Sequence, residues 1–280
     1  MALHELPLEQ RTLHGHFSRE LEPVLTIDRG DSVRITVPNS LWYLESGEQL
    51  PAPDGGHALA GPIAVRDARA GQTLAVTIDD VRPGSWGFTP AEGDGVRWEL
   101  DDGVARGAGH RVRLAPFLGV IGMPPPAAGV HSTRPPRPWG GNIDCKELVA
   151  GSTLYLPIPV DGALLSAGDG HAAQGDGEVA GWAIETPVEA QLTLDLRDDL
   201  PLEWPVARTR DAWLAFGFDE DLDQAARIAI AGILEVMKRE LGVTGGDALV
   251  LASVAVDLRI TQVVNETKGV HAALRDDALR

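Results

Sequence analysis

The sequence predicts a mainly β protein, built of β-sandwich or barrel modules, with an α+β element at its C-terminal end. Two observations support the β part: apolar and polar residues alternate in several short runs, and glycine-containing turns separate those runs. A period of two places every second side chain on a buried face, as in antiparallel sheets. A third observation, one amphipathic helical pattern after residue 220, predicts the C-terminal element.

Three runs carry the alternation most clearly, at residues 33–37, 74–78 and 192–196, where every second residue is Val, Ile or Leu. Glycine supplies turn conformations at no steric cost. Similar glycine turns start three predicted strands, at Gly30, Gly71 and Gly151. Their similarity indicates related β-structures, although a common turn chemistry explains it equally well.

The segment from Pro124 to Pro138 is rich in proline. Proline fixes φ and offers no backbone donor, so this run cannot join a central sheet. It forms either a domain linker or a wall around a site. We expect a β module at 1–125, a second β module with a Gly/Asp/His loop at 126–215, and an α+β element at 216–280, together in one compact unit.

The C-terminal element begins with a helix whose ends are marked in the sequence. Asp221 is a good N-cap, an apolar stripe follows it, and Gly242 ends the pattern. A shorter helix is expected at about 247–255, and a strand with alternating apolar residues at 256–260 follows it.

The composition of this 280-residue chain excludes several classes of protein. With 24 Lys and Arg residues against 41 Asp and Glu residues, the formal net charge is −17. Such a balance repels phosphate backbones and anionic lipids, so neither a nucleic acid nor a membrane partner is expected. The single cysteine, Cys145, cannot form an intrachain disulfide. The N-terminal residues lack the pattern of a secretory signal, and we expect a cytoplasmic protein.

The most unusual segment is residues 168–178, where four glycines, three carboxylates, one imidazole and one amide occur within eleven residues. Glycine lets backbone pass close to a ligand and adopt positive φ, so these side chains can converge on one point. The spacing matches neither a phosphate-binding loop nor an EF-hand. The segment is therefore either a site for a divalent metal or for acid/base chemistry, or a solvated acidic pair of turns.

A second polar segment lies shortly before this loop. Asn142 and Asp144 are two residues apart and share a face if the segment is extended. Cys145 precedes a lysine and a glutamate, the three residue types of a nitrilase-type amidase. Because consecutive strand residues point to opposite faces, a structural role for the cysteine is favoured.

Other catalytic signatures are missing from the sequence, which has no Gly-x-Ser-x-Gly elbow, no adjacent serine pair and no His-Glu-x-x-His. Among the eight histidines, His171 is the strongest candidate for a ligand or an acid/base group, because it lies inside the Gly/Asp loop. His16 and His57 follow, since each adjoins a predicted strand or turn.

Several motifs in a fixed order resemble those of the acetamidase/formamidase family, over nearly the whole chain. Linked motifs in order are more specific than any single one. They are HGHFSR (14–19), GPIAV (61–65), LGVIG (118–122), PPR (135–137), GGNID (140–144), GSTLYLP (151–157), GDGHAAQGDGEV (168–179), DLRITQVVN (257–265) and KGVH (268–271).

The resemblance implies hydrolysis of the C–N bond of a small aliphatic amide, such as formamide or acetamide, to a carboxylate and ammonia. It also implies a mainly β architecture and a homo-oligomer, a dimer or larger. Amide hydrolysis needs a nucleophile, stabilisation of the oxyanion, and a proton for the departing ammonia. Because no serine or cysteine is a convincing nucleophile, water is the expected attacker.

We hypothesise that Asp144, Asp169 and His171, with His16 as a further candidate, hold a divalent cation that activates this water. Zinc suits the nitrogen ligand, whereas an oxygen-dominated set admits calcium or magnesium. No organic cofactor is expected.

The expected general base, and then acid, is Glu178, with Asp176 as a further catalytic carboxylate. Either Asn142 or Gln174 is expected to orient the amide. Two alternatives stay open: the same hydrolysis through a thioester at Cys145, and a non-catalytic β-rich binding protein whose acidic loop holds calcium.

Overall fold

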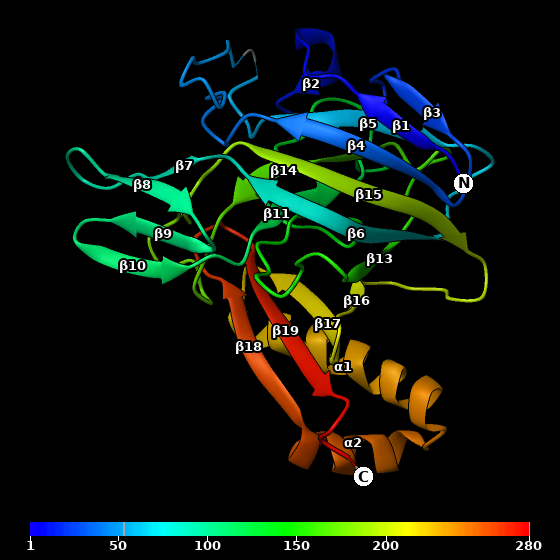
Figure 1. Ribbon diagram of the computed structural model, residues 1–280. Coiled ribbons are helices and arrows are strands. Elements are labelled where there is room, and N and C mark those ends of the chain that lie inside the picture. Colours follow the sequence, from blue (N-terminus) through cyan, green and yellow to red (C-terminus); the bar gives the residue numbers. More distant parts are fainter. Residues whose placement is uncertain (53, 280) are drawn as a thin grey trace.

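The alternating runs of the sequence lie in one nine-stranded sheet of the computed structural model, which describes residues 1–52 and 54–279 (Figure 1). Val33, Val76 and Leu192 are fully buried, as the alternation predicts, and the mainly β prediction is confirmed. In spatial order the strands are β1 (Leu3–Leu6), β4 (Asp31–Val37), β15 (Val188–Arg197), β6 (Thr73–Pro83), β13 (Thr153–Pro157), β16 (Val206–Arg208), β17 (Ala212–Asp219), β19 (Lys268–Arg275) and β18 (Val256–Gln262).

A second sheet packs against the first, and apolar side chains from both form one core. Gly170 lies in the second sheet and faces Val188 at the start of β15 in the first. A Cβ at Gly170 would lie 2.2 Å from Val188 Cγ1, so glycine here lets the two sheets pack closely. The second sheet runs β12 (Gly140–Asn142), β11 (Phe117–Gly122), β14 (Leu165–His171), β5 (Leu59–Val65) and β2 (Leu13–His14), with β3 (Leu25–Ile27) parallel to β5.

A four-stranded antiparallel meander projects from the sandwich, at the left of Figure 1. Its Leu100 packs with Ala172 and Ile184, so it supports the loop that follows β14. The meander comprises β7 (Trp86–Thr89), β8 (Val96–Asp101), β9 (Val104–Gly107) and β10 (His110–Arg113), and one 3-10 turn, η1 (Gln10–Thr12), precedes β2.

The C-terminal element has the predicted helices, α1 (Leu222–Leu241) and α2 (Gly245–Ala255). Asp221 caps α1 by accepting from the Asp223 N–H at 2.8 Å, and Gly242 ends it with φ of 66°. The helices pack on the strands at the bottom of Figure 1 around a separate apolar cluster. In the described part of the chain, neither helix is long and apolar enough to cross a membrane.

The proline-rich segment from Pro124 to Pro138 forms a wall beside the pocket described below. Thr133 in this segment is fully buried, and its Oγ1 lies 2.8 Å from His57 Nδ1. Arg134 lines the pocket itself. Of the two roles that the sequence left open, the structure therefore supports the wall.

Candidate active site

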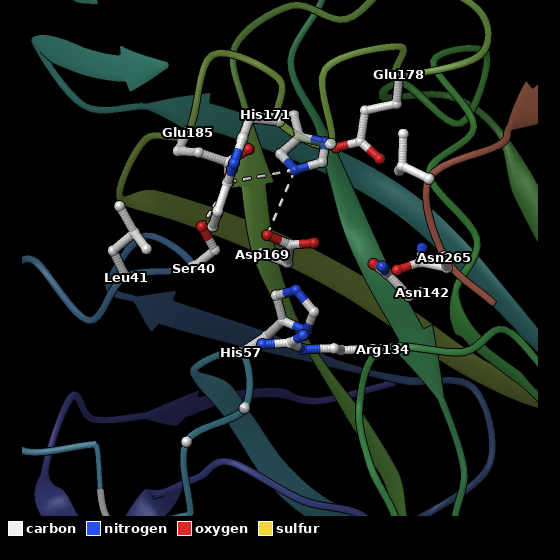
Figure 2. A pocket seen from close by; sticks show the side chains of 15 residues that line it. Ser40, Leu41, His57, Arg134, Asn142, Asp169, His171, Glu178, Glu185 and Asn265 are labelled. Atoms are coloured by element: carbon white, nitrogen blue, oxygen red, sulfur yellow. Dashed lines mark hydrogen bonds and ion pairs between the residues drawn. The ribbon is translucent and has the colours of Figure 1, made fainter. Parts of the chain in front are cut away.

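A pocket of about 250 Å³ opens where β14 ends, and polar side chains from distant parts of the chain point into it (Figure 2). Strand β14 contributes two of these side chains, β12 contributes one, and loops contribute the others. The labelled lining residues are Ser40, Leu41, His57, Arg134, Asn142, Asp169, His171, Glu178, Glu185 and Asn265.

Three carboxylate residues at this site have left-handed backbone conformations. The φ angles are 53° at Asp144, 60° at Asp169 and 44° at Glu178. Residues other than glycine rarely adopt such angles, and each costs about 1 kcal/mol or more, so surrounding contacts must hold them. At Asp144, the backbone carbonyl accepts from Gln174 Nε2 at 2.7 Å. Strained carboxylates at one pocket point to a functional constraint.

Three side chains of the site converge on Gly119 of β11, although neither Gly119 nor Asp144 is among the residues that line the pocket. A Cβ at this position would lie 2.5 Å from Asp169 Oδ2, 2.7 Å from Asp144 Oδ1 and 2.9 Å from His171 Cε1. The absence of a side chain at Gly119 therefore leaves the space in which two carboxylates and an imidazole meet.

His171 is fully buried, and its two ring nitrogens have different surroundings. Its Nε2 lies 3.3 Å from Asp169 Oδ1 and 3.4 Å from Glu185 Oε2. Glu185 is itself fixed, because it accepts from Ser40 Oγ at 2.7 Å and from the Ala183 N–H at 2.9 Å. The other nitrogen, Nδ1, has no hydrogen-bond partner among the described residues and points toward Glu178 (Figure 2).

The electrostatics of the cluster are dominated by burial and by excess negative charge. Burial raises the pKa of Asp144 well above its usual range, and nearby Glu178 adds to the effect. Burial also raises the pKa of Glu178, to about 7. Burial would raise the pKa of Asp169 too, but His171 and His57 outweigh it and lower that pKa to about 2. Burial opposes a charge on His171, yet Glu185 and Asp169 raise its pKa well above the usual value.

These side chains have the composition of a metal site. Both carboxylate oxygens of Asp144 are buried and lack a hydrogen-bond partner within the described residues. A buried ionised carboxylate without a partner is costly, and a bound cation removes that cost. Ligand atoms of Asp144, His171 and Glu178 lie within 4.8 Å of one another, as do those of Asp169, His171 and Glu185. Mixed oxygen and nitrogen donors of this kind suit zinc.

Comparison with known proteins identifies the family of this chain. The model of the acetamidase/formamidase family matches residues 125–274, which include β12, β14 and the loop to Glu178. The chain belongs to the acetamidase/formamidase family. A formamidase-like protein of Schizosaccharomyces pombe is 28% identical over 253 residues, covering 61% of this chain and 60% of that protein. The chain thus spans about three fifths of that relative's length.

Solved structures of the family have the same fold. The crystal structure of an acetamidase from Bacillus halodurans gives a TM-score of 0.85 at 26% identity, covering 98% of this chain and 97% of that one. A predicted acetamidase/formamidase from Thermoanaerobacter tengcongensis gives 0.85 at 25% identity, covering 98% and 95%. A gamma lactamase from Delftia acidovorans shares only the fold, at 20% identity and a TM-score of 0.64, covering 100% and 93%.

Five of the site residues predicted from the sequence of this chain meet at the site. Four of them line the pocket, and the fifth, Asp144, lies behind the lining beside Gly119. They are Asn142, Asp144, Asp169, His171 and Glu178.

Three other candidates lie outside that constellation. His16 Nδ1 lies 2.9 Å from Asp54 Oδ2 and belongs to none of the candidate ligand groups in the described chain. Asp176 is exposed and pairs with Lys146 at 2.9 Å, because the turn at Gly177 directs it to the surface. Gln174 contacts the backbone carbonyl of Asp144 and does not line the pocket.

Sequence reasoning missed Ser40, Glu185, Arg134 and Asn265 as pocket residues. Asn265 and Gly119 could have been found from the sequence, because both fall inside motifs that resemble those of the family.

Cys145 does not line the pocket. Its thiol donates to Glu147 Oε2 at 3.3 Å, and burial raises the pKa of the thiol well above the usual value. A thiol in this state is a poor nucleophile, which argues against the thioester route.

Proposed function

We propose that this protein hydrolyses the C–N bond of a small aliphatic amide to a carboxylate and ammonia, with water as the nucleophile and Glu178 as general base. The observation that carries the proposal is the buried Asp144, whose two oxygens lack partners in the described chain, next to a carboxyl with a pKa near 7. Relatives named acetamidase, from Mycolicibacterium smegmatis, and formamidase, from Methylophilus methylotrophus, support the substrate class.

Asp144 and His171 Nδ1 would hold a divalent cation, whereas Asp169, the third ligand expected from the sequence, lies beside Nε2. The imidazole favours zinc over calcium or magnesium. When bound, the cation supplies Lewis-acid polarisation of the amide carbonyl and lowers the pKa of water. The unpartnered Nδ1 of His171 is the nitrogen available for it, while Nε2 faces Asp169 and Glu185. A carboxylate beside the far nitrogen fixes the ring and increases its basicity.

Glu178 carries the proton transfers. Its pKa of about 7 lies near neutral pH, which suits a group that first accepts and then donates a proton. The carboxylate takes a proton from the attacking water as the oxygen bonds to the carbonyl carbon. It then gives this proton to the amide nitrogen as the C–N bond breaks, and ammonia leaves.

Recognition of the amide falls to two side-chain amides at one wall of the pocket. Asn142 Oδ1 and Asn265 Nδ2 are buried without hydrogen-bond partners in the described chain, and both residues line the pocket (Figure 2). A primary amide has an N–H to donate and a carbonyl to accept, so one free acceptor beside one free donor matches it. A buried polar group left unpaired discriminates against substrates that cannot bond to it.

The test is ammonia release from formamide, acetamide and propionamide, with metal analysis on the same samples. We expect Glu178→Gln to lower kcat by about 10²–10⁴-fold with unchanged metal content. Loss of metal in this variant instead identifies Glu178 as a ligand. The control is Asp176→Asn, an exposed carboxylate two residues away, which is expected to retain activity. No ammonia from any amide overturns the function, and full activity after exhaustive chelation overturns the metal.

A further inference from the structure

A second cluster of metal-ligating side chains lies outside the pocket, on the other side of the Asp144–Cys145 peptide. Ligand atoms of Cys145, Glu147 and His271 all lie within 4.8 Å of one another. None of the three lines the pocket. We propose that these three residues form a separate site for a thiophilic divalent cation such as Zn²⁺, which ties the turn after β12 to strand β19.

His271 is the observation that points to a ligand. Its side chain is fully buried, and its Nδ1 lies 2.9 Å from Thr261 Oγ1. Its Nε2 has no hydrogen-bond partner in the described chain, yet faces Glu147 Oε1 at 3.7 Å, too far for a hydrogen bond. In the tautomer whose Nδ1–H donates to Thr261 Oγ1, the lone pair of Nε2 points into the cluster. A metal-binding histidine is commonly fixed in this way through its other nitrogen.

The Cys145–Glu147 pair has the spacing of two ligand atoms on a tetrahedral ion, and a ligand atom of His271 lies within 4.8 Å of both. Zn–S of about 2.3 Å with Zn–N and Zn–O of about 2.0–2.1 Å places neighbouring ligand atoms about 3.3–3.6 Å apart. Cys145 Sγ lies 3.3 Å from Glu147 Oε2, and His271 Nε2 lies 3.7 Å from Glu147 Oε1. Arg259 Nη1 holds Glu147 Oε1 at 2.6 Å, which orients Oε2 toward the cysteine.

The charges also balance. The thiol proton leaves for solvent when the ion binds, so a thiolate and a carboxylate face the two positive charges while His271 stays neutral. The Glu147 side chain is 20% exposed, which opens the site to solvent and to a water as fourth ligand. This site does not depend on the proposed amide hydrolysis, because a structural ion here would act on the packing of β19 against the sandwich.

The chain itself supplies the test, because Cys145 is its single cysteine. Co²⁺ bound to a thiolate gives a near-ultraviolet charge-transfer band, so in this protein that band reports only Cys145. Metal-free full-length protein is titrated with Co²⁺, and the wild type is expected to develop the band and to lose it when Zn²⁺ is added. Absence of the band in the wild type overturns the proposal, and this measurement requires no variant.

Two variants separate this site from the pocket. Asp144→Asn removes a pocket carboxylate and is expected to keep the thiolate band, whereas Cys145→Ser is expected to lose it together with one equivalent of bound Co²⁺. His271→Gln is expected to weaken Co²⁺ binding at the thiolate by 10-fold or more, roughly what loss of one supporting ligand costs. Unchanged affinity in His271→Gln, or a band lost in Asp144→Asn, contradicts the three-ligand site.

Discussion

Asp144 and Cys145 are neighbours in the chain, but their side chains belong to two clusters with opposite electrostatics. In the pocket, burial and neighbouring carboxylates raise the pKa of Asp144 well above its usual range. In the second cluster, burial alone would raise the pKa of Glu147, but His271, Cys145 and Arg259 lower it to about 2. One carboxylate is buried where neighbouring carboxylates and burial outweigh the charge of His171, and the other is buried beside Arg259.

The difference separates a carboxylate that is held in an unfavourable state from one whose hydrogen bonds are made. The pocket combines left-handed backbone at Asp144 and Glu178 with buried oxygens that lack partners. Such features reduce stability and persist where they serve binding or catalysis. The carboxylate of Glu147 has its hydrogen bonds already. The pocket therefore has more to gain from a ligand than its neighbour has, and three changes test this contrast.

The largest effect is expected from filling the space at Gly119 where the carboxylates meet. In Gly119→Ala, the new Cβ would meet Asp169 Oδ2 at 2.5 Å and Asp144 Oδ1 at 2.7 Å, so both carboxylates must move. A displacement of about 1 Å in a catalytic constellation can cost on the order of 10²-fold in rate. We expect at least that loss in kcat/KM for acetamide, measured by ammonia release, together with weaker binding of metal in the pocket.

The matched control is Gly175→Ala in the loop before Glu178. A Cβ there has no heavy atom within 4 Å among those described, so it is expected to change kcat/KM by less than about 2-fold. Equal losses in the two variants would mean that alanine disturbs the fold generally, and that Gly119 is not the meeting point of the carboxylates.

An intermediate effect is expected on the pH dependence of stability in the metal-free protein. The pKa of Glu178 rises from 4.5 to about 7 on folding, so the folded state disfavours its ionised form. Its contribution to the free energy of unfolding is therefore retained below pH 4.5 and lost as pH rises through 7. The loss is on the order of 3 kcal/mol. Urea denaturation in chelator at pH 5 and pH 8 measures it, and Glu178→Gln should abolish this part of the pH dependence. An unchanged pH dependence in that variant rules out Glu178 as the group responsible.

The sequence predicted the regular elements well, because their signals are local. Alternation located the buried faces of β4, β6 and β15, and an N-cap with a terminal glycine gave the limits of α1. The domain limits, the cytoplasmic location and the homo-oligomer stay predictions, since sedimentation and localisation measurements are needed to test them.

The site was only half predictable, for a physical reason. Residues on one loop or strand, such as Asp169 and His171, are visible as a cluster in the sequence. Glu185 and Ser40 reach the pocket only through tertiary packing, which no local pattern encodes. Conversely, Asp176 has the right chemistry and spacing, but one positive-φ glycine after it directs the chain so that it faces solvent.

The smallest effect is expected in the second cluster, from Arg259→Gln. Removing the guanidinium leaves Glu147 Oε1 partly buried and short of a partner, which should cost about 1–2 kcal/mol in the free energy of unfolding at pH 7. Because the pKa of Glu147 is lowered on folding, its contribution is present above 4.5 and is lost as pH falls toward 2. Urea denaturation should therefore show a difference between wild type and variant that is larger at pH 7 than at pH 3. Arg208→Gln, which breaks the more exposed pair with Asp276, is the control and should cost less than about 1 kcal/mol. A loss in Arg259→Gln that is the same at both pH values would mean that Arg259 acts by packing, and that the carboxylate of Glu147 is not the group it satisfies.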